Sequence, residues 1–153
     1  MHTFPRRLLS AILLLLVAGT LACGCTGSPD AQTGTVTISS NTTAYAPVMS
    51  QTVGIELAAH YSGPAQDAAY HWITDYGEFV AWASPDYEVT PLGADAVTQE
   101  PVVYWTYLPE QPGEEPATVR VAVTVEEAGT GRTLATAEQK IVRDGSLYRP
   151  AAE

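Results

Sequence analysis

The sequence predicts an all-β protein that folds as a single β-sandwich of about seven strands. Three observations support this prediction. Apolar and polar residues alternate with period two along most of residues 35–142. No helical period persists in the same region. Turn signals rich in glycine, proline and aspartate separate the extended runs at intervals of roughly 8–12 residues, a spacing typical of sandwiches and barrels.

The first half of this region contains four expected strands, at residues 35–38, 53–59, 69–74 and 79–82. The second strand alternates Ile55 and Leu57 with Glu56, which predicts that one face is buried. The third strand carries Trp72, and an Asp-Tyr-Gly turn at residues 75–77 separates it from the fourth.

The second half contains one short and three longer expected strands, at residues 87–90, 102–108, 118–126 and 134–142. Residues 91–95 are expected to end the short strand. Residues 109–116 are expected to form an acidic loop with three prolines. The glycine-rich turn at 128–131 joins the last two strands in a hairpin. Residues 146–153 are expected to form a loose C-terminal tail.

Two segments of this pattern are distinctive. Residues 70–77 read Tyr-His-Trp-Ile-Thr-Asp-Tyr-Gly, and residues 118–125 form a long strand with a valine at every second position, followed by the acidic Glu126. Together these segments resemble a PKD domain. The resemblance covers about half of the chain beyond its N-terminal segment. It implies an immunoglobulin-like sandwich over residues 35–145, with Trp72 in the core and the last two strands paired as strands F and G.

The N-terminal segment predicts an export signal. Arg6 and Arg7 precede the uncharged run Leu8–Leu21, which is shorter than the roughly 20 residues that a membrane-spanning helix needs. The small residues and cysteines that follow resemble the lipobox of prokaryotic lipoproteins, in which a cysteine is diacylated. Cys25, which follows a glycine, is the favoured anchor and Cys23 the alternative. An ordinary secretory signal without lipidation stays open.

The chain therefore divides into four expected parts: signal and anchor cysteine (1–25), flexible tether (26–34), sandwich (35–145) and tail (146–153). The expected location is the extracytoplasmic side of the cell membrane or the cell surface, with attachment through lipid. Beyond Cys25 the sequence has no cysteine, so the domain is expected to be stable through its core alone.

The charge balance limits the partners. After the signal, five basic and seventeen acidic residues remain, which gives a net charge of −12. Such a surface repels phosphate backbones and anionic head groups, so no nucleic-acid partner is expected.

Patterns that carry catalysis are absent from the sequence. It has no His-Glu-x-x-His, no nucleophile elbow and no glycine-rich phosphate loop. His60 and His71 could bind a metal together with Glu56 if their strands were neighbours. The simpler interpretation places the two histidines on different sheets. We therefore expect no enzyme, no cofactor and no metal.

The aromatic residues offer the best candidates for ligand binding. Trp72 is expected in the core, whereas the strand with Trp105 could bury either face. Trp82, near a Ser-Pro turn, is the best candidate for an exposed ring, with Tyr76 or Tyr87 beside it. The sequence thus predicts a non-catalytic binding or structural module of the cell envelope, contacting a surface protein or a glycan. The alternative is a carbohydrate-binding module that uses these exposed aromatics.

Overall fold

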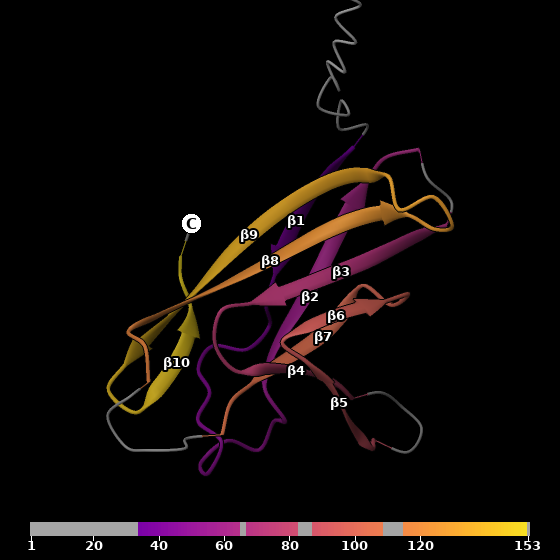
Figure 1. The fold of residues 1–153 in the computed structure, drawn as a ribbon. Coiled ribbons are helices and arrows are strands. Elements are labelled where there is room, and N and C mark those ends of the chain that lie inside the picture. Colours follow the sequence, from indigo (N-terminus) through magenta and orange to yellow (C-terminus); the bar gives the residue numbers. More distant parts are fainter. Residues whose placement is uncertain (1–33, 65–66, 83–86, 109–114, 153) are drawn as a thin grey trace, which may run out of the picture.

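The computed structural model describes residues 34–64, 67–82, 87–108 and 115–152, which form two antiparallel sheets packed against each other (Figure 1). The strands are β1 (Thr35–Ser39), β2 (Ile55–Ser62), β3 (Ala68–Thr74), β4 (Glu78–Trp82), β5 (Val89–Gly93), β6 (Asp95–Thr98), β7 (Val102–Thr106), β8 (Thr118–Glu127), β9 (Thr133–Asp144) and β10 (Leu147–Pro150). Sheet A has the order β1-β2-β7-β4-β5, and sheet B has the order β10-β9-β8-β3-β6. The predicted all-β sandwich is confirmed.

Seven of the strands follow the immunoglobulin order. In sheet A, β1-β2-β7-β4 occupy the places of strands A, B, E and D, and in sheet B, β3-β8-β9 occupy those of C, F and G. The expected hairpin of the last two long strands is present as β8 and β9. Strands β5, β6 and β10 are additional, so the described chain has ten strands rather than about seven.

The short strand expected at residues 87–90 overlaps β5, but β5 continues through Gly93 and β6 begins at Asp95, where the sequence predicted a break at residues 91–95. Strand β5 runs through Pro91, which is tolerated because β5 is the edge of sheet A and pairs on one side only. Gly93 then adopts a φ of 87°, a conformation that glycine takes without strain. The chain crosses there to sheet B and continues as β6, which pairs with β3.

The expectation of a loose tail at residues 146–153 is wrong. Residues Leu147–Pro150 form strand β10, which pairs with the end of β9. Gly145, with a φ of 65°, turns the chain back on itself. Tyr148 of β10 is fully buried. Its backbone also forms two hydrogen bonds with Tyr45, with N···O distances of 2.7 Å from Tyr45 N and 2.8 Å from Tyr148 N. The loop between the paired Asp144 and Leu147 is Gly145-Ser146, a glycine-first pair typical of a two-residue hairpin turn.

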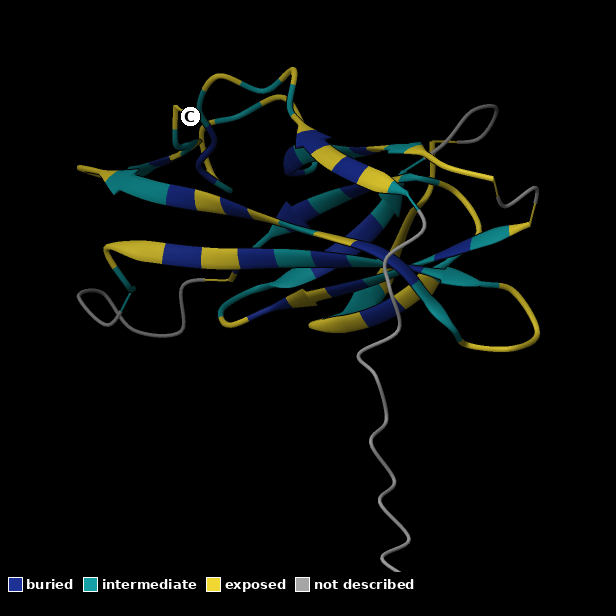
Figure 2. Cartoon of the chain, turned by 90° about the horizontal axis from the view of Figure 1, so that it is seen from above, coloured by how far each residue is buried: buried dark blue, intermediate teal, exposed yellow. Residues whose placement is uncertain are grey.

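The core lies between the sheets, and Figure 2 shows buried and exposed positions alternating along the long strands. Strand β8 buries all four of its alternating valines, as predicted. Trp72 is fully buried, as expected, and its ring lies 6.1 Å from that of Phe79. On β7 the buried face is the one that carries Val103 and Trp105, which settles the alternative that the sequence left open.

Aromatic side chains close the core at the end where β10 docks. The Tyr148 ring lies 5.2 Å from Trp105 and 5.0 Å from Tyr107, centroid to centroid. Its hydroxyl donates a hydrogen bond of 2.7 Å to the carbonyl of Pro116. Burial raises the pKa of Tyr148 to about 12. The C-terminal strand is therefore part of the core rather than an appendage.

Candidate functional site

The structure brings two of the predicted ligand-binding residues together on the outer face of sheet A. Trp82 ends β4 and Tyr87 precedes β5, and their ring centroids lie 5.4 Å apart. The Trp82 indole N–H donates a 3.0 Å hydrogen bond to the Tyr87 carbonyl. Trp82 is half-buried, and Tyr87 is 56% exposed. At the surface, the pair thus presents one half-buried ring held by a hydrogen bond and one solvent-exposed ring.

A third aromatic residue, Tyr104, joins this pair and was missed by the sequence prediction. Its neighbours on β7, Val103 and Trp105, face the core, so Tyr104 faces outward. Its ring meets Trp82 edge to face, at 5.5 Å and 81°. The available signal was the strand's alternation, since the two large apolar neighbours form the better core face.

A carboxylate lies beside the three rings. Glu56 of β2 stands directly opposite Tyr104 in the β2–β7 register. It accepts a 3.2 Å hydrogen bond from the Tyr104 hydroxyl at one oxygen and a 2.9 Å bond from the Asn41 amide at the other. Burial, and next the charge of Glu56, raise the pKa of Tyr104. We call the five residues Asn41, Glu56, Trp82, Tyr87 and Tyr104 the outer strip.

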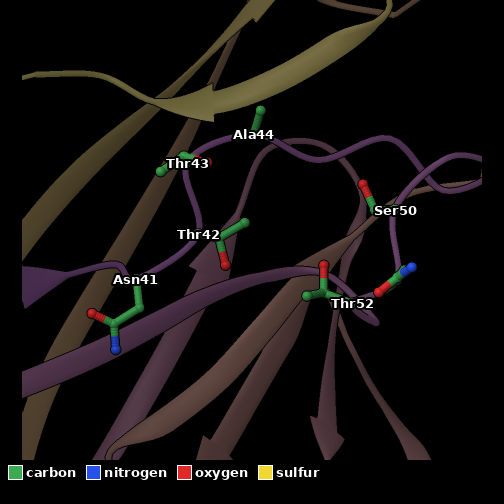
Figure 3. A pocket seen from close by; sticks show the side chains of 7 residues that line it. Asn41, Thr42, Thr43, Ala44, Ser50 and Thr52 are labelled. Atoms are coloured by element: carbon green, nitrogen blue, oxygen red, sulfur yellow. The ribbon is translucent and has the colours of Figure 1, made fainter.

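A shallow polar pocket adjoins the Asn41 end of the outer strip. It has a volume of about 270 Å³ and is lined by Asn41, Thr42, Thr43, Ala44, Ser50, Gln51 and Thr52. In Figure 3 two arms of one loop face each other, with the side chains of Thr42 and Thr52 between them. The Thr42 hydroxyl accepts a 3.0 Å hydrogen bond from the Glu56 backbone N–H, which ties the pocket to β2.

Tyr76, the remaining predicted ligand-binding residue, lies in a different environment. Its ring packs 5.9 Å from that of Tyr107, which faces the core, and its carbonyl accepts a 2.7 Å bond from the Trp105 indole. Tyr76 therefore belongs to the aromatic group at the end of the core. The sequence could not show this, because the direction of a turn side chain depends on what it packs against.

The two histidines lie on different sheets, in agreement with the simpler interpretation. His60 on β2 lies 2.7 Å from the Ser39 hydroxyl. His71 on β3 lies 2.7 Å from Asp95 and 3.5 Å from Glu126, one carboxylate at each ring nitrogen. The hydrogen bond to Asp95 is the main cause of a raised His71 pKa. In the described ranges, no group of three or more His, Cys, Asp and Glu side chains is arranged so that it could hold a metal ion.

Both candidate anchor cysteines, Cys23 and Cys25, lie outside the described residues, as does most of the acidic loop, residues 109–114. Within the part of the chain that the structure describes, there is no helix long and apolar enough to cross a membrane.

Comparison with protein-family models, with curated proteins and with solved structures gave no match.

Proposed function

We propose that the chain is a non-catalytic binding module, held at the extracytoplasmic face of the cell membrane by a lipid on Cys25, with Cys23 as the alternative attachment point. The support for the anchor is the order of the N-terminal sequence: two arginines, an uncharged run of limited length, then small residues and cysteines. The support for the binding role is the outer strip.

The composition of the outer strip is the observation that carries the binding role. Antiparallel sheets usually present polar residues on their solvent face. Here Trp82, Tyr87 and Tyr104 gather on that face instead. Val89 and Val102, on the neighbouring strands, are 46% and 38% exposed. Apolar patches rimmed by polar groups mark interaction sites.

The same strip argues against hydrolysis of a bound glycan. Glycosidases use a pair of carboxyl groups about 5–10 Å apart on either side of the bond that is cut. Among the five residues of the outer strip, Glu56 is the one with a carboxylate, and both of its oxygens already accept hydrogen bonds; Glu88, the next acidic residue, follows Tyr87 and is exposed. Recognition without cleavage is the role that this arrangement supports.

A carbohydrate ligand is the second candidate within this proposal. The contact between Trp82 and the exposed Tyr87 favours it, because flat exposed rings on a sandwich can stack on sugar rings.

Mass spectrometry of the mature N-terminus tests the anchor. We expect a diacylglyceryl group on Cys25 and loss of membrane attachment in Cys25→Ala, with Cys23→Ala as the matched control. A mature protein whose N-terminus carries no lipid would overturn the anchor.

Retention of the unlipidated variant Cys23→Ala/Cys25→Ala on isolated envelope fragments tests the binding role, because a lipid anchor would by itself hold the chain on the membrane. The further substitutions are made in this variant. The double variant Trp82→Ala/Tyr87→Ala should lose retention. The matched control Ile73→Ala/Val97→Ala removes two exposed apolar side chains, 45% and 61% exposed, from the outer face of sheet B and should keep retention. Equal retention of both double variants would place recognition elsewhere.

A further inference from the structure

We infer that the ligand of the outer strip is a neutral glycan. In this arrangement a sugar ring stacks on the exposed Tyr87 ring, which the Trp82 ring supports at an angle of 58°, and hydroxyls of the glycan hydrogen-bond to the Glu56–Asn41 pair. This inference rests on the proposed binding role and adds the ligand class and the role of each residue.

The aromatic part of the strip is ordered before any ligand arrives. The Trp82 indole is held by its hydrogen bond to the Tyr87 carbonyl and by its T-shaped contact with the Tyr104 ring. A fixed ring loses little conformational entropy when it is covered, which favours binding. The negative face of an aromatic ring attracts the weakly positive C–H groups on one face of a pyranose.

The backbone at Tyr87 adds an independent observation. Its φ is 52°, and within the described residues it is the one residue other than glycine with a positive φ. Bulky side chains rarely adopt this conformation, which costs on the order of 1–2 kcal/mol, and such strain clusters at functional sites. At this strained position the exposed Tyr87 ring lies against Trp82. A glycine here would relieve the strain, but it would also remove the ring.

The polar part of the strip has unused hydrogen-bonding capacity. An ionised carboxylate has about four lone-pair sites, and an amide has two N–H donors and a carbonyl acceptor. Glu56 uses one bond at each oxygen, to Asn41 and to Tyr104. Its remaining lone pairs and the Asn41 carbonyl can accept from sugar hydroxyls, and the second Asn41 N–H can donate to one.

The polar pocket extends this surface beyond the first sugar. Its lining consists almost wholly of hydroxyl and amide side chains, and its volume is about 270 Å³. That volume lies near the lower end of the range for small-molecule pockets. A pocket of this chemistry next to Asn41 suits a second sugar unit or a branch.

The charge of the protein selects the kind of glycan. The domain carries far more acidic than basic residues, and Glu56 lies at the centre of the outer strip. Uronic-acid and phosphate-bearing polymers would be repelled. The complementary ligand is therefore a glycan without anionic groups.

Titration calorimetry on the full chain in detergent micelles tests the inference. The neutral probes are the hexasaccharides of cellulose, xylan and mannan, whose units carry vicinal diols, and the anionic probe is polygalacturonate. We expect binding to at least one neutral probe, weakened about tenfold by Tyr87→Ala. Tyr87→Phe keeps the ring and should stay within about threefold of the wild type. Val97→Ala on the opposite sheet should leave affinity unchanged.

One further variant tests the polar contacts separately from stacking. Glu56→Gln should weaken binding, because an amide nitrogen would then face either the Asn41 amide or the incoming hydroxyls. Circular dichroism and urea midpoints of each variant show whether the fold is intact. Binding only to polygalacturonate, or equal affinity of Tyr87→Ala and the wild type, would overturn the inference.

Chemical treatment of the envelope fragments distinguishes this inference from the proposed function. Periodate cleaves vicinal diols of sugars, and a protease removes protein partners. Loss of retention after periodate alone supports a glycan ligand. Loss after protease alone overturns the glycan and keeps the binding module. No retention on untreated fragments, together with no binding to any probe, overturns both.

Discussion

Replacing Tyr148 with alanine should destabilise the sandwich more than any surface change. Tyr148 is fully buried and packs on Trp105 and Tyr107. Truncating a buried aromatic residue costs about 3–5 kcal/mol, through lost burial and the remaining cavity. The lost hydrogen bond to the Pro116 carbonyl adds about 1 kcal/mol. The expected loss of about 4–6 kcal/mol is a large part of the roughly 5–15 kcal/mol of a typical domain.

Urea denaturation followed by tryptophan fluorescence measures this loss, because Trp105 lies against the substituted ring. Tyr148→Phe keeps the ring and should lose only about 1 kcal/mol. A chain that ends at Gly145 lacks all of β10 and should lose at least as much as Tyr148→Ala. If this shortened chain unfolded at the wild-type midpoint, β10 would contribute nothing to the core and the argument would fail.

Three other predictions follow from local geometry. His71 has a raised pKa in the folded state, chiefly through Asp95. Its contribution to stability is therefore complete below the unfolded pKa of about 6.5 and is lost as pH rises through the folded pKa. NMR titration of Asp95→Asn should show a lower His71 pKa, and unfolding curves of this variant should show a loss of stability at pH 5 but none at pH 9. The pKa of Tyr148 is raised to about 12, so the folded state loses stability between about pH 10 and 12. Tyr148→Phe should move alkaline unfolding, followed by circular dichroism, to higher pH. Gly77→Ala should destabilise by about 2–3 kcal/mol in thermal unfolding, because φ is 76° and the new Cβ would lie 2.4 Å from a carbonyl oxygen. Gly129→Ala, with φ 85° and open space around it, should cost about 1 kcal/mol; equal losses would contradict the role of the close contact.

The fold was predictable where the pattern is local. The valines of β8 and the burial of Trp72 follow from alternation and residue size, and both are found. Strand β5 was predicted only at its start, in the expected strand at residues 87–90, and β6 was missed. Pro91 and Gly93 look like breakers until β5 is known to be an edge. Tyr148 was missed because its burial depends on β9 and Tyr45, which lie elsewhere in the sequence.

The outer strip was predictable only in part, for a similar reason. Trp82 and Tyr87 are close in the sequence, and a turn between them could be expected to bring their rings together. Tyr104 reaches Trp82 because β7 pairs with β4, and it reaches Glu56 because β7 also pairs with β2. These pairings join segments 22–48 residues apart. A sequence without such pairing information cannot assemble the strip.

The two ends of the described chain should respond differently to mechanical load. A pull on the chain before Thr35 enters the domain along β1, whose five residues all pair with β2. Hydrogen bonds of an antiparallel pair lie perpendicular to the strands, so this pull loads them in shear and all at once. A pull beyond Pro150 instead opens the β9–β10 hairpin from its free end, one pair after another. Strain applied at the N-terminal side would therefore meet a stiff domain, and the same strain at the C-terminal side would first release Tyr148 from the core.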